Sequence, residues 1–159
     1  MIEEKLNEIG FKIPEAPIPL ASYIPAVQVG NLVFTAGQIP MKNGELIHKG
    51  KIGIPLTEGS SDEISSVETG IKAAELCTIN CLSVIKSVIG DLDMIKRIIK
   101  VTVFVNSADS FTEQPKVANG ASDLLVKVFG ENGKHVRSAV GVNELPIDSA
   151  VEVEMIVEV

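Results

Sequence analysis

The sequence is poor in aromatic and basic side chains. It contains no tryptophan and one tyrosine, Tyr23, and its 14 lysines and arginines are outnumbered by 21 aspartates and glutamates, for a formal net charge of −7. Nucleic-acid binding needs basic residues that neutralise phosphates, and single strands are held by stacking on aromatic rings. Both shortages therefore argue against a nucleic-acid partner.

Cysteine is nearly absent, since Cys77 and Cys81 are the only two. No histidine pair lies near them in the sequence, and a structural zinc ion needs four ligands, so no metal site is predicted. Their spacing places them one turn apart on a predicted helix. We therefore expect two small side chains that face the core, in a protein from a reducing compartment.

Leader and membrane signals are also missing. The N-terminus begins Met-Ile-Glu-Glu, which lacks the basic region of a signal peptide. Residues 16–41 carry no charge, but prolines interrupt this stretch, and a membrane helix there would leave backbone groups unpaired in lipid. We therefore expect a cytoplasmic protein that does not span a membrane.

The apolar content is high for a soluble chain of this length. Of the 159 residues, 45% are hydrophobic and 22% are charged, and the mean hydropathy is +0.29. The length suits one domain, 1–159, in which residues 1–20 form an N-terminal helix and an extended connector. The apolar excess predicts an oligomer, because assembly removes apolar surface from water.

Helical periodicity and terminal signals predict the helices. A short helix is expected within residues 1–10, and a long one over 62–89, with Ser60 and Glu63 as a capping box. For the third helix, which ends at Gly130, the residues leave two possible starts. These are a capping box of Ser110 and Glu113, or a first turn that contains Pro115.

Alternating and β-branched runs predict the strands. The element order is ββ(β)–α–β–α–ββ, which is typical of an α+β fold with one mixed β-sheet and two helices packed on one face. The other face then needs a partner, which oligomerisation would supply. The predicted segments are a hairpin over 26–37 that turns at Gly30-Asn31, a weaker strand over 41–53, a central strand over 98–105, and final strands at 137–142 and 150–159.

Charged residues lie on two strands that are largely apolar. Arg137 opens one strand, and Glu152 and Glu154 lie on the last strand, opposite its valines. A partly buried guanidinium demands a carboxylate or phosphate, and two interpretations stay open: an ion pair with one of these glutamates, or a small-molecule carboxylate. Spacing alone favours solvated surface charges for the glutamates. The alternative is a role at a subunit junction, holding a water or moving a proton.

Four other residues are ambiguous on pattern alone. Asn119 lies within the predicted third helix, where it is either exposed or fixes a loop or ligand through its amide. For Tyr23, a partly buried packing ring is favoured over a pocket residue. His48 and His135 fall in predicted loops without an evident nucleophile nearby, so no catalytic triad is predicted.

Five segments of the sequence form a characteristic set of motifs: VGNLVFTAGQIP (29–40), KVTVFV (100–105), RSAVGV (137–142), Leu145-Pro146 and VEVE (151–154). In this order they resemble the motifs of the RidA/YjgF family of reactive-intermediate deaminases, some of whose members are labelled L-PSP endoribonucleases. The similarity runs from about Tyr23 to the C-terminus, and residues 1–20 with the long helix resemble a longer-chain branch of the family.

The resemblance implies a chorismate-mutase-like fold and a homotrimer whose sheets form a central barrel, with sites in clefts between subunits. The implied chemistry is hydrolysis of enamines and imines such as 2-aminoacrylate to 2-keto acids and ammonia, without a metal or organic cofactor. Two alternatives stay open: a non-catalytic or regulatory trimer that binds small carboxylates, and an endoribonuclease, which the acidic charge disfavours.

By this resemblance, Arg137 grips the substrate carboxylate and Glu152 positions the attacking water. Tyr23 and Asn119 match residues of the site. Gly37 matches a glycine whose backbone lines the cleft from the neighbouring subunit.

The chain departs from the family pattern at two positions. Ala139 stands where many members have cysteine, but the family role belongs to the backbone carbonyl, which accepts a hydrogen bond from the imine nitrogen. Ala36 stands where serine is common, and the lost hydroxyl contact bears on substrate preference.

Overall fold

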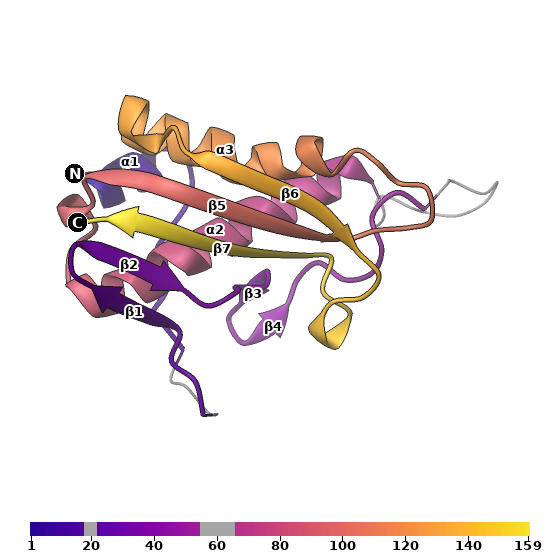
Figure 1. Cartoon of the computed structure of the whole chain (residues 1–159), viewed down its shortest axis with the longest axis horizontal. Coiled ribbons are helices and arrows are strands. Elements are labelled where there is room, and N and C mark those ends of the chain that lie inside the picture. Colours follow the sequence, from indigo (N-terminus) through magenta and orange to yellow (C-terminus); the bar gives the residue numbers. More distant parts are fainter. Residues whose placement is uncertain (18–21, 55–65) are drawn as a thin grey trace.

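The computed structural model describes residues 1–17, 22–54 and 66–159 (Figure 1). The elements follow the predicted order. Their bounds are α1 Ile2–Glu8, β1 Ala26–Val29, β2 Leu32–Thr35, β3 Met41–Lys42, β4 Glu45–Leu46, α2 Val67–Ile89, η2 Leu92–Met94, β5 Arg97–Asn106, α3 Gln114–Phe129, η3 Gly130–Gly133, β6 Val136–Val142, η4 Pro146–Asp148 and β7 Val151–Glu158.

Five strands form one mixed sheet in the order β1-β2-β7-β5-β6. Neighbouring strands are antiparallel except β5 and β6, which are parallel and connected through α3. Helices α2 and α3 lie side by side on one face of this sheet (Figure 1). The predicted mixed α+β architecture, with two helices on one face, is therefore confirmed. The weaker strand expected over 41–53 is a separate small hairpin of β3 and β4.

The turn of the predicted first hairpin is confirmed at Gly30, where φ is +62°. The left-handed region is easily reached by glycine, which has no Cβ. The N-terminal helix is also confirmed, since α1 lies within residues 1–10. The rest of the connector beyond residue 17 lies outside the described residues until residue 22.

The structure shows where the two long helices begin. Helix α2 begins after Ser66, whose hydroxyl accepts a hydrogen bond from the Thr69 amide at 3.1 Å, whereas the predicted capping box of Ser60 and Glu63 lies outside the described residues. Helix α3 carries Pro115 in its first turn, which confirms the second of the two predicted starts. Ser110 has a φ of +65°, a left-handed conformation that differs from the extended backbone of an N-cap.

The core lies between the sheet and the two helices α2 and α3. The valines of β7 are buried in alternation with its glutamates, as the sequence predicts. Cys77 and Cys81 are fully buried against β7, with their sulfur atoms 3.5 Å and 3.3 Å from the carbonyl oxygens of Val151 and Val153. The prediction of two core-facing cysteines is confirmed, and burial raises the pKa of Cys81 to about 12, so its thiol stays protonated.

Glycines let α2 and α3 approach each other closely. A Cβ on Gly120 of α3 would lie 2.2 Å from the backbone oxygen of Ile71, and a Cβ on Gly70 of α2 would lie 2.9 Å from Val117. This contact fixes α3 against α2, so that Asn119, the neighbour of Gly120, lies on the exposed side of the helix.

We expect Gly120→Ala to lower the free energy of unfolding by about 1–3 kcal/mol, because the methyl group meets backbone that cannot rotate away. This loss opposes the gain in helix propensity, which would otherwise favour alanine. Urea unfolding measures the difference. Lys116→Ala, on the exposed surface of the same helix, is the control and should change stability by less than about 0.5 kcal/mol. Equal stability of Gly120→Ala and the wild type would contradict the close packing.

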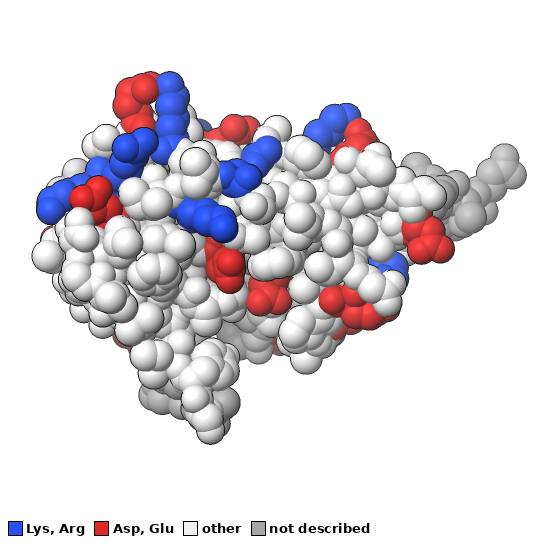
Figure 2. Space-filling model, viewed as in Figure 1, with Lys and Arg blue, Asp and Glu red and all other residues white. Residues whose placement is uncertain are grey.

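Among the described residues, no helix covers the opposite face of the sheet (Figure 1). Strand β7 presents Glu152, Glu154 and Glu158 there, beside Thr102 and Phe104 of β5. Figure 2 shows this face: lysine and arginine side chains gather toward the end where β5 begins, and acidic side chains lie farther along. Separately, none of the helices in the described ranges has the length and apolarity to cross a membrane.

Candidate functional site

Arg137 lies on the edge strand β6 and turns toward α3. It pairs with buried Val101 of β5, so its side chain leaves the sheet on the helix-covered side. Its Nη1 donates hydrogen bonds to Asn119 Oδ1 at 2.9 Å and to Ser122 Oγ at 3.1 Å. Among the described residues no ion pair includes Arg137, so the predicted alternative of an internal pair with Glu152 or Glu154 is wrong.

The contacts of Arg137 use only one corner of the guanidinium. Within the described part of the chain, Nε and Nη2 have no hydrogen-bond partner, and the side chain is exposed. Nε and Nη2 together form the side-on fork that matches the two oxygens of a carboxylate. The arrangement can therefore bind a carboxylate while Asn119 and Ser122 hold the remaining corner.

Asn119 therefore has both properties that the sequence left as alternatives, since it is exposed and its amide fixes a side chain. Two further residues, Ser122 and His135, were not predicted as site residues, and no nucleophile was evident near His135 in the sequence. Ser122 Oγ lies 3.0 Å from His135 Nε2, and His135 Nδ1 lies 2.6 Å from the Gly133 carbonyl oxygen. Their spacing could have predicted both residues. Ser122 follows Asn119 by about one helical turn, and His135 precedes Arg137 by two positions, so each lies on the same side as a predicted site residue.

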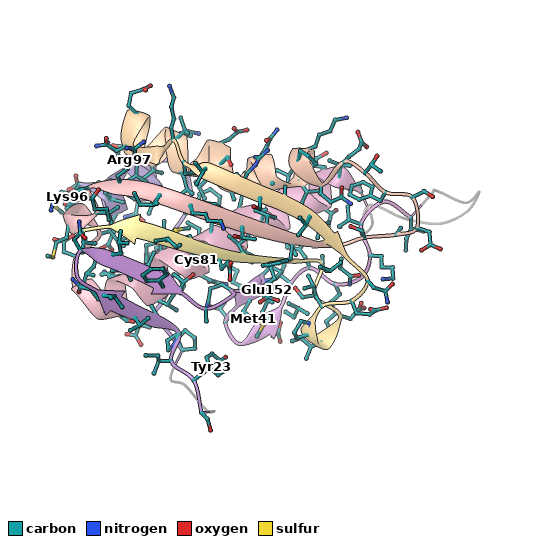
Figure 3. The ribbon with its side chains drawn as sticks, in the orientation of Figure 1. Tyr23, Met41, Cys81, Lys96, Arg97 and Glu152 are labelled. Atoms are coloured by element: carbon teal, nitrogen blue, oxygen red, sulfur yellow. The ribbon has the colours of Figure 1, made fainter. Side chains whose placement is uncertain are left out.

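Glu152 lies on the uncovered face of the sheet, near the β3-β4 hairpin (Figure 3). The side chain is half-buried, and its pKa is raised by burial and, in addition, by the negative charge of Glu154. The interpretation as an ordinary solvated charge is therefore wrong for Glu152. A half-buried carboxylate with a raised pKa is suited to proton transfer or to holding a water molecule.

Gly37 leaves the space that the Glu152 carboxylate fills. A Cβ at this position would lie 1.8 Å from Glu152 Oε1. The backbone here is fixed by the next residue, Gln38, whose amide donates to the Val153 carbonyl at 2.7 Å and whose carbonyl accepts from the Val153 amide at 2.9 Å. The sequence matched Gly37 to a site position, and the structure places it directly against Glu152.

We expect Gly37→Ala to displace the Glu152 carboxylate and change the free energy of unfolding by less than about 1 kcal/mol. The methyl group meets the end of a flexible side chain, which can rotate at small cost. Any activity that depends on Glu152 should fall about tenfold or more, because a small misplacement of a reacting group costs much of the rate. In a Glu152→Ala background the same glycine change should have no further effect, and an additive loss would contradict the contact.

The predicted site residues fall into separate groups within one chain. Arg137 pairs with Val101, and Glu152 pairs with Phe104, three positions along the same strand, so the two side chains point to opposite faces of the sheet. Ala139 follows Arg137 on the helix-covered side and is half-buried.

Tyr23 joins neither group. It precedes β1 on a segment that leaves the body of the chain and is 63% exposed, so the prediction of a packing ring is wrong (Figure 3). In the described ranges, no cluster of three or more His, Cys, Asp or Glu residues could hold a metal ion.

Comparison with known proteins defines the class to which this fold and these motifs belong. The family described as "YjgF/chorismate_mutase-like, putative endoribonuclease" matches residues 3–159. The chain therefore belongs to the RidA/YjgF family, and its mixed α+β structure agrees with the chorismate-mutase-like fold.

Three similar proteins illustrate this relationship. Protein TCP17 of Trypanosoma cruzi is 42% identical over 99% of this chain and 93% of its own. A crystal structure of a protein of unknown function from Agrobacterium tumefaciens is 41% identical, covers 99% of this chain and 92% of its own, and superposes with a TM-score of 0.87. The 2-iminobutanoate/2-iminopropanoate deaminase of Dermatophagoides farinae is 30% identical over 91% of both chains.

Proposed function

We propose that this protein hydrolyses enamines and imines of the 2-aminoacrylate type to 2-keto acids and ammonia. The observation that carries the proposal is the open Nε–Nη2 fork of Arg137, whose other corner is held by Asn119 and Ser122. The similarity to a named 2-iminobutanoate/2-iminopropanoate deaminase supports the same chemistry. No metal or organic cofactor enters the proposed reaction.

The two groups of site residues require a second copy of the chain. Arg137 and Glu152 point to opposite faces of one sheet, so one chain cannot bring both to one small substrate. The proposed assembly is a homotrimer whose uncovered sheet faces line a central barrel, with the Glu152 and Gly37 of one copy meeting the Arg137, Asn119 and Ala139 of another. Light scattering should then give three times the chain mass of 16.9 kDa.

In the proposed mechanism, the enamine first tautomerises to the imine. Arg137 binds the carboxylate, and the Ala139 carbonyl accepts a hydrogen bond from the nitrogen of the protonated imine. A water molecule held by Glu152 adds to the carbon of the C=N bond and gives one proton to the Glu152 carboxylate, which leaves a hydroxyl and an amine on that carbon. Glu152 passes this proton to the amine nitrogen. The hydroxyl then gives its proton to the Glu152 carboxylate as the C–N bond breaks, so that ammonia leaves and the C=O bond of the 2-keto acid forms. Glu152 finally releases this proton to the departing ammonia or to solvent. Orientation supplies most of the acceleration.

The test is to generate 2-aminoacrylate from L-serine with a pyridoxal-phosphate-dependent dehydratase and to trap it with semicarbazide. The wild-type protein should shorten the lifetime of the imine and reduce the trapped fraction in proportion to its concentration. A lifetime equal to the uncatalysed value would refute the deaminase function. If pyruvate still stabilised the protein against heat, the non-catalytic carboxylate binder would be the better description.

The endoribonuclease label in the family description predicts a different result. RNA cleavage that survives the loss of Arg137, in a preparation free of contaminating nuclease, would favour that function over the deaminase. The net charge of −7 opposes it, because RNA backbones are bound by basic surfaces. We further place the reaction in the cytoplasm, a reducing compartment that suits two buried thiols.

A further inference from the structure

A chain of hydrogen bonds runs from the Arg137 guanidinium into the protein. Arg137 Nη1 contacts Ser122 Oγ at 3.1 Å, Ser122 Oγ contacts His135 Nε2 at 3.0 Å, and His135 Nδ1 contacts the Gly133 carbonyl at 2.6 Å. Ser122 and His135 are half-buried, and their segments are separated in the sequence by the last turns of α3 and by η3. The proposed hydrolysis uses neither residue directly.

The carbonyl at the end of the chain sets the direction of every hydrogen bond in it. A carbonyl oxygen only accepts, so His135 Nδ1 carries a hydrogen and donates it to Gly133. In the neutral ring Nε2 is then an acceptor, and the Ser122 hydroxyl donates to it. With its one hydrogen committed, Ser122 Oγ presents lone pairs to Arg137, which can only donate.

This direction determines how the guanidinium is held. Asn119 and Ser122 accept the hydrogens of Nη1 from two sides, which fixes the rotation of the planar group as well as its position. The Nε–Nη2 fork then keeps one orientation before a ligand arrives. A side chain on an exposed edge strand would otherwise lose rotamer entropy when it binds a carboxylate.

We infer that His135, acting through Ser122, is a positioning residue for Arg137, and that its neutral ring with the hydrogen on Nδ1 is the form that supports binding of 2-keto and 2-imino carboxylates. The inference deepens the proposed deaminase function and rests on it for the identity of the ligand. Neither residue is required to touch the substrate.

The surroundings of His135 favour the neutral ring. It lines a surface groove of about 460 Å³ together with Arg97, Ile99, Lys134 and Val136. Among the charged residues, Arg97 of β5 and Lys134 line the same groove, and Arg137 follows His135 by two positions on β6, while α3 contributes the uncharged Ser122. Lys134 is paired with Glu131 at 2.8 Å, so Arg137 is the charge that acts on the His135 ring. Burial lowers the pKa of His135 most, the Arg137 charge lowers it further, and the hydrogen bond to Gly133 opposes both.

Protonation of His135 would reverse the hydrogen bond between Ser122 and His135, so that the ring becomes the donor. A hydrogen on Nε2 points at Ser122 Oγ, takes one of its lone pairs and turns the hydroxyl hydrogen away from the ring. Because burial and the Arg137 charge lower the pKa of His135, this change needs a more acidic solution than an ordinary histidine requires. We therefore expect carboxylate affinity to weaken at acidic pH through His135.

The test compares two disrupting variants with two conservative ones. Ser122→Ala and His135→Phe should raise KM for the imine and the dissociation constant for 2-oxobutanoate roughly tenfold, with kcat within about twofold, because orientation of Arg137 is lost but Glu152 is untouched. Ser122→Thr keeps the hydroxyl, and the Oε1 of His135→Gln can accept in place of Nε2, so both should restore most of the affinity. Circular dichroism and urea unfolding establish that each variant is folded.

Two further measurements separate positioning from a purely structural role. Long-range ¹H–¹⁵N NMR should show the hydrogen of His135 on Nδ1 at neutral pH, and a ring with its hydrogen on Nε2 would overturn the inference. The acidic rise in the dissociation constant of 2-oxobutanoate should shrink in His135→Gln, which cannot titrate.

The outcomes distinguish this inference from the proposed function. Turnover by the wild type, with unchanged KM and affinity in Ser122→Ala and His135→Phe, overturns the inference and leaves the deaminase intact. Binding of 2-oxobutanoate without turnover overturns the deaminase, and the affinities of the four variants still decide the inference. A wild-type protein that neither turns over imine nor binds a 2-keto acid overturns both.

Discussion

Replacement of Arg137 by alanine should lower kcat/KM for 2-aminoacrylate by about 10²- to 10³-fold. Removal of one partner from a hydrogen-bonded charge pair costs about 2–5 kcal/mol, and each 1.4 kcal/mol is a factor of about ten. The effect should appear mainly in KM, because the carboxylate is equally charged in the substrate and in the transition state. Arg137→Lys should recover little, since an ammonium group lacks the side-on fork of Nε and Nη2.

The matched control is Arg97→Ala, since Arg97 is the other arginine in the chain. Arg97 is exposed at the start of β5 (Figure 3). Its replacement by alanine changes the net charge by the same amount as Arg137→Ala. The imine-trapping assay at several substrate concentrations separates KM from kcat. If Arg137→Ala and Arg97→Ala showed the same small loss, the effect would be one of net charge, and the proposed carboxylate site would be wrong.

Glu152→Gln should lower kcat by about 10²-fold or more and leave KM nearly unchanged. Glutamine keeps the shape of the side chain beside Gly37 but cannot take a proton from the attacking water, and positioned proton transfer contributes about 10²–10⁴ to rate. Binding through Arg137 should persist, so 2-oxobutanoate should still protect the variant against thermal unfolding. A kcat equal to that of the wild type would remove Glu152 from the mechanism.

The pH dependence of kcat gives a second test of Glu152. Its pKa is raised by burial and by Glu154, and the carboxylate is the active form, so activity should fall as the pH falls through this raised value. Glu154→Gln removes the neighbouring negative charge and lowers the pKa of Glu152, so the acidic limb of the profile should move to lower pH. Glu158→Gln, farther along β7, should leave that limb in place. Equal shifts in both variants would contradict the specific effect of Glu154.

The sequence predictions succeeded for features that depend on neighbouring residues and failed for features that depend on contacts between distant segments. Alternation of valine and glutamate predicted β7 and its two faces, because a strand repeats every two residues. Spacing predicted the buried cysteines, and Pro115 predicted one start of α3, because both depend on a few neighbouring residues. The prediction for Tyr23 failed, because its surroundings depend on contacts that local sequence does not specify.

The hydrogen-bond partners of Arg137 also could not be predicted from the local sequence. On pattern alone, two partners for the Arg137 guanidinium stayed open: one of the two glutamates on the last strand, or a small-molecule carboxylate. The pairing of β6 with β5 turned Arg137 toward α3 instead, where it meets Asn119 and Ser122. Strand register is set by contacts between distant segments, and a shift of one residue reverses the face of every side chain.

By itself, the sequence determined the kinds of elements, their order, the family and the chemistry of single residues, because these follow from local periodicity, composition and motifs. Only the tertiary structure decided which residues share a site. It separated Arg137 from Glu152 onto opposite faces, placed Gly37 against Glu152 and connected His135 to Arg137 through Ser122. The physical reason is that sheet register and helix packing join residues far apart in the chain, and no local pattern encodes such distances.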